Sequence, residues 1–137
     1  MTAIDLNYPI LCQTPSGLSF VSNPKWLSMA FVANLRSDYY EKLIVTDAEG
    51  ITYRVAEVIK VGWVGWFWGF SLIFSRRAKI VLQLSPAPKQ FSLQEAKDII
   101  LRDFRKSSEW SSRGNLDELK KSVASATTFR ELFEAIR

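Results

Sequence analysis

The stretch LIVTDAEGITYRVAEVIKVG, residues 43–62, decides the fold because it holds two strand-like runs joined by a short polar turn. Residues 43–45 and 51–55 are rich in β-branched and aromatic side chains, which favour strands. Gly50 stands where such a loop commonly closes with a positive φ, which glycine adopts without strain. We therefore predict an antiparallel hairpin whose second strand continues towards Val61.

Two further elements are expected before this hairpin. Residues 8–23 contain two short extended runs on either side of the turn signal at residues 14–17. Residues 22–38 carry apolar side chains at helical spacing, and Pro24 stands where the first turn of a helix tolerates proline. The sequence therefore predicts a pair of strands followed by one helix.

The second half of the chain predicts one strand and then helices. Apolar and polar side chains alternate over residues 80–85, as in a strand that is covered mainly on one face, and Pro86 ends the run. Three helix-start signals follow, in which a capping side chain comes three residues before a glutamate: residues 92–95, 115–118 and 128–131.

Length and composition indicate one globular domain over residues 1–137. The chain has 137 residues, of which 47% are hydrophobic and 23% are charged, close to ordinary globular usage. The order of the elements predicts an α+β fold. We expect a mostly antiparallel sheet of four to five strands, with one early helix and two to three C-terminal helices.

The stretch VGWVGWFWGFSLIF, residues 61–74, is the most aromatic part of the chain. It is bounded by Lys60 and Arg76, so it is shorter than the roughly 17 apolar residues that a spanning helix needs. Its glycines disfavour a helix. Four exposed aromatic side chains would form a patch of roughly 600–1,000 Å², which is large for a soluble monomer. We expect most of them to be buried, either in the core or against a partner.

The sequence lacks the residues that several kinds of catalytic and metal site require. The chain has no histidine and a single cysteine, Cys12, which excludes histidine-based triads, histidine zinc sites and thiolate metal clusters. No phosphate-binding glycine loop is present. We therefore expect no enzyme, no cofactor and no metal, with an enzyme built on carboxylates or tyrosines as an alternative.

We expect a cytoplasmic protein that is unlikely to bind nucleic acid. The net charge is +4, but the basic side chains of the last third are interrupted by acidic ones within a helical turn, which makes nucleic acid an unlikely partner. The first residues lack a basic region followed by an apolar run, so we expect no secretory leader and no membrane insertion. One unpaired thiol fits a reducing compartment.

The order of motifs resembles the small immunity proteins of bacterial polymorphic-toxin systems, including the contact-dependent inhibition group. The resemblance rests on Trp26-Leu27, the hairpin LIVTDAEGITYRVAEV, the connection rich in glycine and tryptophan, and the helix starts Ser-Leu-x-Glu and Thr-Phe-Arg-Glu-Leu. It extends over residues 22–137. Such proteins are cytoplasmic and non-enzymatic, and each binds one cognate toxin domain. The resemblance implies the same role for this chain.

The candidate contacts with a toxin are aromatic side chains of the stretch and acidic side chains of the hairpin turn. Tryptophan and other aromatic residues often anchor protein interfaces. The partner-binding residues that we predict are Trp63, Trp66, Trp68, Phe70, Asp47 and Glu49. The alternative is a small-ligand or carbohydrate-binding module that uses the same tryptophans as a stacking platform.

Overall fold

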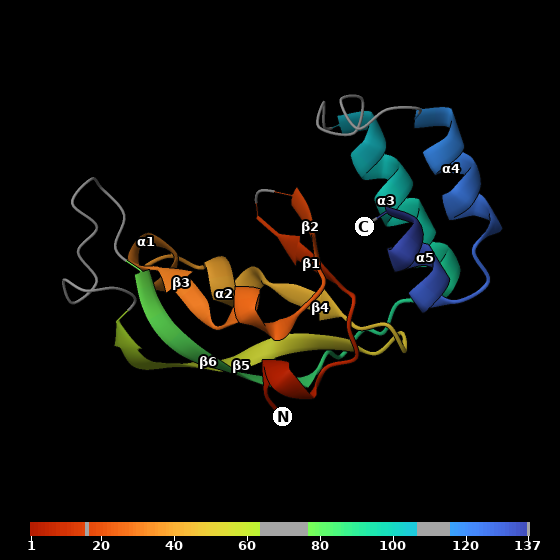
Figure 1. The fold of residues 1–137 in the computed structure, drawn as a ribbon. Coiled ribbons are helices and arrows are strands. Elements are labelled where there is room, and N and C mark those ends of the chain that lie inside the picture. The colour runs from red at the N-terminus through yellow and green to blue at the C-terminus, as the bar shows by residue number, and fades with distance from the viewer. Residues whose placement is uncertain (16, 64–76, 107–115, 137) are drawn as a thin grey trace.

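A computed structural model describes residues 1–15, 17–63, 77–106 and 116–136. The strands form one six-stranded sheet. Figure 1 shows this sheet at one side of the molecule and α3, α4 and α5 at the other. Every strand pair in the sheet is antiparallel, in the order β2-β1-β4-β5-β6-β3. The predicted α+β class is confirmed, with six strands where four to five were expected.

The elements follow one another along the chain as strands, then helices, with short helical turns among the strands. The strands are β1 (Ile10–Thr14), β2 (Gly17–Val21), β3 (Met29–Phe31), β4 (Ile44–Thr46), β5 (Thr52–Trp63) and β6 (Arg77–Pro86). The helices are α1 (Val32–Leu35), α2 (Tyr39–Lys42), α3 (Leu93–Lys106), α4 (Leu116–Ser125) and α5 (Phe129–Ile136), with 3-10 turns η1 (Ala3–Asp5) and η2 (Pro24–Leu27).

The predicted hairpin is present as β4 and β5. Thr46 pairs with Thr52 across its turn, and their hydroxyl oxygens lie 3.2 Å apart. Gly50 closes the turn with a φ of 86°, which confirms its predicted role. β5 then pairs with β6 along its whole length, with register shifts between Val55 and Glu57 and between Lys60 and Gly62.

The predicted continuous helix over residues 22–38 is wrong, because strand β3 separates two short helical segments, η2 and α1. Asn23 does cap a helical turn by accepting a hydrogen bond from the Lys25 amide, but that turn is η2 and ends at Leu27. Residues 29–31 then form β3, which pairs with β6. This pairing supplies strand partners to residues 77–79 of β6, so tertiary pairing overrides the helical spacing of the side chains.

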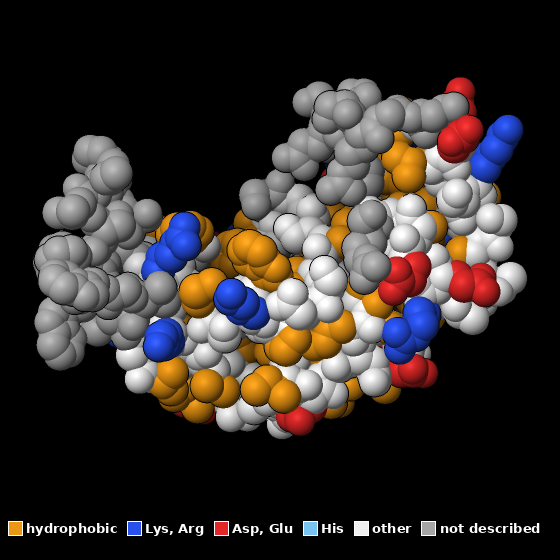
Figure 2. Space-filling view, in the orientation of Figure 1, with side chains coloured by type: hydrophobic (Ala, Val, Ile, Leu, Met, Phe, Trp, Pro, Cys, Tyr) orange, Lys and Arg blue, Asp and Glu red, His pale blue; other side chains and the backbone are white. Residues whose placement is uncertain are grey.

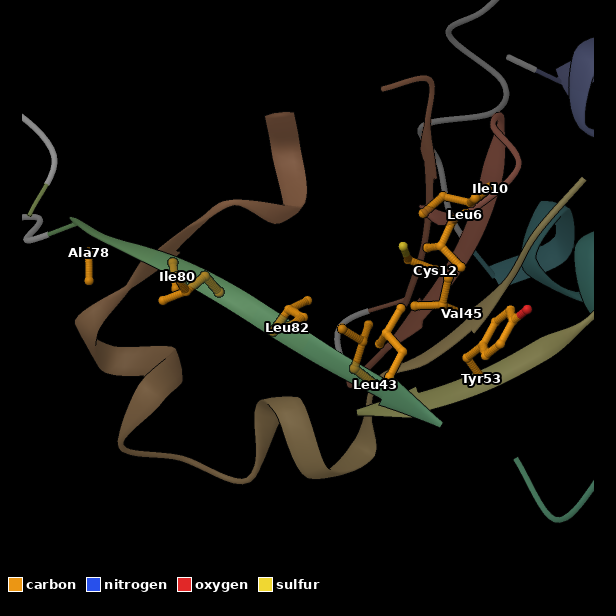
Figure 3. Packing of buried hydrophobic residues seen from close by; sticks show 11 residues of the cluster. Leu6, Ile10, Cys12, Leu43, Val45, Tyr53, Ala78, Ile80 and Leu82 are labelled. Atoms are coloured by element: carbon orange, nitrogen blue, oxygen red, sulfur yellow. The ribbon is translucent and has the colours of Figure 1, made fainter. Parts of the chain in front are cut away.

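Two clusters of buried apolar side chains make the core. The first lies on one face of the sheet, where alternate residues of β6 (Ala78, Ile80, Leu82 and Leu84) pack with residues of the other strands (Figure 3). The second cluster joins α3, α4 and α5 to the other face of β1 through Leu11. The sheet therefore has apolar contacts on both faces near β1.

Capping hydrogen bonds confirm two of the three predicted helix starts in detail. The Glu95 amide donates to the Ser92 hydroxyl and the Ser92 amide donates to the Glu95 carboxylate, both at 3.2 Å. The Glu131 amide donates to the Thr128 hydroxyl at 3.1 Å. α4 is also present, although its predicted cap, Asn115, lies outside the described residues. Of the helices that the structure describes, none has both the length and the apolar character needed to cross a membrane.

Substitution of Gly50 by alanine should destabilise the fold. A Cβ at this position would stand 2.5 Å from the Phe129 ring, and the φ of 86° strains any residue with a Cβ. We expect Gly50→Ala to lower the free energy of unfolding by about 2 kcal/mol or more, as measured by urea denaturation.

Gly62→Ala is the matched control. A Cβ there would meet only the Lys79 Cδ at 4.0 Å, and no positive φ is required. A Gly50→Ala protein as stable as Gly62→Ala would contradict the described packing of α5 on the turn.

Candidate functional site

A groove of about 520 Å³ lies between the two edges of the sheet. One wall comes from Ser19–Val21 of β2, and the opposite wall comes from Met29–Phe31 of β3. Cys12 and Leu43, which belong to the first core cluster, also line it. Figure 1 shows the same arrangement: the β1–β2 hairpin rises from one side of the sheet, and β3 and α1 lie towards the other.

The groove is rich in aromatic side chains and carries no charge among its described lining residues. Tyr39 and Tyr40 of α2 lie edge to face, with ring centroids 5.0 Å apart. Burial raises the pKa of Tyr40 to about 12 and also raises the pKa of Tyr39. Both hydroxyls are therefore neutral at pH 7 and can donate hydrogen bonds. The groove suits uncharged, largely apolar groups.

A smaller hollow of about 140 Å³ adjoins the groove and shares four residues with it. Trp26 on η2 is 65% exposed and Phe31 on β3 is 43% exposed. The Arg77 guanidinium carbon lies 5.0 Å from the centroid of the Phe31 ring, within the range of a cation–π contact. We call Trp26, Met29, Phe31 and Arg77 the aromatic rim.

The predicted aromatic contacts fall mostly outside the described residues. Trp66, Trp68 and Phe70 lie in residues 64–76, of which nothing is described. Trp63 is the last residue of β5, and its backbone pairs with Ala78 of β6. Ala78 pairs in turn with Ala30 of β3, so β5 ends beside the strand that carries Arg77 and two strands from Met29 and Phe31.

Asp47 is buried, which corrects the view that it is an exposed residue of the turn. Its side chain is 0% exposed. One carboxylate oxygen accepts hydrogen bonds from the amides of Glu49 and Ile51, each at 3.0 Å, while the other is buried without a described hydrogen-bond partner. This pattern holds the turn together and leaves Asp47 no surface to offer a partner.

Glu49 is exposed but lies near a described cation. Its carboxylate is 3.6 Å from the Arg130 guanidinium, and the same guanidinium donates a hydrogen bond of 2.9 Å to the Tyr8 carbonyl. Such exposed ion pairs stabilise a fold weakly. Together with the packing of Phe129 on Gly50, they place α5 against the turn.

The structure separates the predicted contacts into two groups. Glu49 precedes the start of β5 and Trp63 ends it, and β5 has 12 residues. A strand of this length spans roughly 35 Å. Asp47 and Glu49 therefore do not belong to one compact patch with Trp63.

Sequence reasoning missed the aromatic rim. Phe31 falls within the predicted helix over residues 22–38, whereas the structure places it exposed on an edge strand. A sequence signal was present: Trp26 follows Asn23 and Pro24, which favour a short capped turn as much as a long helix. Only the pairing of β3 with β6 brings Arg77 beside Phe31.

Cys12 should react slowly with alkylating agents although it lines the groove. It is 2% exposed, and burial raises the pKa of its thiol to about 12. At pH 8 the thiolate fraction is then about 1 in 10,000, against about a quarter for an unfolded chain. We expect iodoacetamide to modify the native protein roughly a thousand-fold more slowly than the urea-unfolded protein, followed by mass spectrometry. Similar rates in the two states would show that Cys12 is accessible and ionised.

Comparisons with protein-family models, curated proteins and solved structures find no match for this chain. Over the described residues, no three cysteine, aspartate or glutamate side chains gather where they could hold a metal ion. The groove and the aromatic rim are the described features that bear on function.

Proposed function

We propose that this protein is a non-enzymatic binding protein, an immunity protein that binds a cognate bacterial toxin domain and neutralises it. The observation that carries the proposal is the aromatic rim beside an uncharged groove. The proposal includes a cytoplasmic location, because an immunity protein of this kind acts inside the cell that makes it.

The residue types of the rim support a protein partner. Interfaces are enriched in aromatic residues, methionine and arginine, and tryptophan and arginine are frequent hot spots. Trp26, Met29, Phe31 and Arg77 supply this composition around one hollow. A large apolar side chain from a partner could fill the hollow and cover the exposed Trp26 ring.

A small neutral ligand is the second candidate for the groove. Its volume of about 520 Å³ falls within the 300–1,000 Å³ typical of small-molecule sites, and its lining is apolar with two tyrosine hydroxyls. An exposed tryptophan on the rim adds little to the recognition of a ligand enclosed in the groove, which is why we place a protein partner first.

The proposal predicts that the rim is needed for protection and for binding. The assay co-expresses this protein with the product of the neighbouring gene and measures cell survival and co-purification. We expect Trp26→Ala to weaken binding by about 2 kcal/mol, roughly 30-fold in the dissociation constant. Phe31→Ala should have a smaller effect in the same direction, because Phe31 is less exposed.

Ile51→Ala is the matched control, because Ile51 is also apolar and is 42% exposed but lies in the turn before β5, at the opposite end of the β5–β6 ladder from the rim. It should bind and protect as the unaltered protein does. Equal survival with and without this protein would refute the immunity function. Wild-type binding by Trp26→Ala would refute the role of the rim.

A further inference from the structure

We propose that the cognate toxin presents an acidic surface with an apolar centre, and that one of its carboxylates binds the Arg77 guanidinium at the aromatic rim. This inference rests on the proposed function and names the chemistry by which the partner is recognised. Three observations carry it: an open face of the sheet, cations on that face without a described ion pair, and the fixed position of Arg77.

The rim belongs to the face of the sheet that is opposite to the first core cluster. Alternate residues of β6 pack into that cluster, so Arg77 and Lys79 point to the other face. Phe31 pairs with Arg77, which places both side chains on this face, and Met29 and Lys79 form the next such pair. Ile59 of β5 lies farther along the same face and is 37% exposed. We call this the outer face.

The cations around the rim are not balanced by neighbouring acidic residues. Residues 22–37 and 77–86 contain no aspartate or glutamate. Their basic residues are Lys25, Arg36, Arg77 and Lys79. In the described part of the chain, neither Arg77 nor Lys79 forms an ion pair, and no acidic side chain lines the rim. Glu57 lies on the outer face, but four β6 positions beyond Lys79. This end of the outer face therefore attracts anionic groups.

Arg77 is placed to receive a carboxylate. Its guanidinium carbon lies over the Phe31 ring, 5.0 Å from the ring centroid, and the two residues are cross-strand partners. A guanidinium on an aromatic ring keeps N–H groups in its own plane for hydrogen bonds, and these match the two oxygens of a carboxylate. A side chain that is positioned before binding also loses less entropy when the partner arrives.

An acidic partner also solves the problem of covering Arg77. A partner that fills the hollow of about 140 Å³ beside Trp26 and Phe31 takes the guanidinium out of water. A cation that is covered without a counter-charge is strongly destabilised, whereas a carboxylate replaces the lost water. The complementary surface is therefore an apolar side chain for the hollow with a carboxylate beside it.

Nucleic acids and anionic membranes also carry negative groups, but this face suits them less well. A nucleic-acid backbone is followed by a row of cations, whereas the outer face continues beyond Lys79 with the apolar Val81 and Ile59. A hollow for one side chain and a guanidinium held on a ring suit a partner whose own groups are fixed, as in a folded protein. A fluid lipid surface lacks such fixed groups.

The test measures binding of the neighbouring gene's product to the full chain by surface plasmon resonance, in 100 and 500 mM NaCl. We expect the higher salt to slow association at least fivefold, because screening weakens the attraction between opposite charges. Arg77→Glu should weaken binding at least tenfold at 100 mM NaCl. Arg77→Lys keeps the charge but loses the planar fork, so its loss should be intermediate.

Lys79→Glu is a second charge reversal at the same end of the face, and it leaves the contact between Arg77 and Phe31 in place. It should slow association in the same direction. Thermal unfolding followed by circular dichroism shows which variants are folded. If Arg77→Glu does not fold, Lys79→Glu and the salt dependence of the unaltered protein decide the question.

Arg54→Glu is the matched control. Arg54 is exposed on the outer face, but it pairs with Ser85 at the other end of the β5–β6 ladder. Ser85 is eight positions from Arg77 along β6, roughly 27 Å, which is well beyond the Debye length of about 10 Å at 0.1 M salt. The same change of charge there should leave the affinity and the association rate unaltered.

Three results would overturn the acidic partner and leave the proposed function standing. In the first, Trp26→Ala weakens binding of the neighbouring gene's product while Arg77→Glu and Lys79→Glu do not. In the second, association does not respond to salt. In the third, Arg77→Glu and Arg54→Glu cause equal losses, so that only the total charge matters. No binding by the unaltered protein would overturn the proposed function and this inference with it, so the two failures are distinguishable.

The other occupants of the face are tested with the same variant. The probes are vesicles of phosphatidylcholine with phosphatidylserine and a single-stranded DNA of 20 nucleotides, and sedimentation gives the mass of the free protein. Binding of either probe that Arg77→Glu abolishes, while toxin binding survives, would assign the face to that class of partner. A dimer that Arg77→Glu converts to a monomer would assign it to a second copy of this chain.

Discussion

The pairing of β5 with β6 is the constraint on which the rest of the structure depends. It is the longest ladder of the sheet, running from Tyr53 opposite Pro86 to Trp63 opposite Ala78. Its two register shifts are the kind of irregularity that bends a strand pair. β4 and β1 continue from β5, and β3 continues from β6, so this ladder sets where both edges of the sheet lie.

The two ends of the β5–β6 ladder hold different features: a structural turn at one end and the candidate binding surface at the other. At the end near Tyr53, the buried Asp47 organises the turn, and α5 packs against it through Phe129. At the other end, Arg77 begins β6 beside Phe31, and η2 presents Trp26 to solvent. Figure 2 shows several acidic side chains towards the helical end of the molecule, away from the apolar surface over the sheet. The structural turn and the candidate binding surface are therefore far apart.

The features that the sequence predicted well depend on residues close together in the chain. Gly50 marked its turn because the required φ belongs to one residue type, and Ser92 and Thr128 marked helix starts because a cap needs only residues within one helical turn. The α+β class followed from the order of these local signals.

What the sequence did not predict depends on contacts between distant residues. Residues 29–31 form a strand because they pair with β6, although the spacing of their apolar side chains favours a helix. The burial of Asp47 follows from the packing around the turn, which the polar sequence of the turn conceals. The groove could not be predicted at all, since β2 and β3 are brought to its two sides only by the order of strands in the sheet.

The central claim is that a protein partner binds at the aromatic rim. The most direct measurement is amide hydrogen exchange of this protein with and without the toxin, resolved by peptide and mass spectrometry. We expect slower exchange over residues 24–31, which include η2 and β3, and unchanged exchange over the turn at residues 47–51 and over α5. Protection confined to the turn and α5, with residues 24–31 unaffected, would contradict binding at the rim.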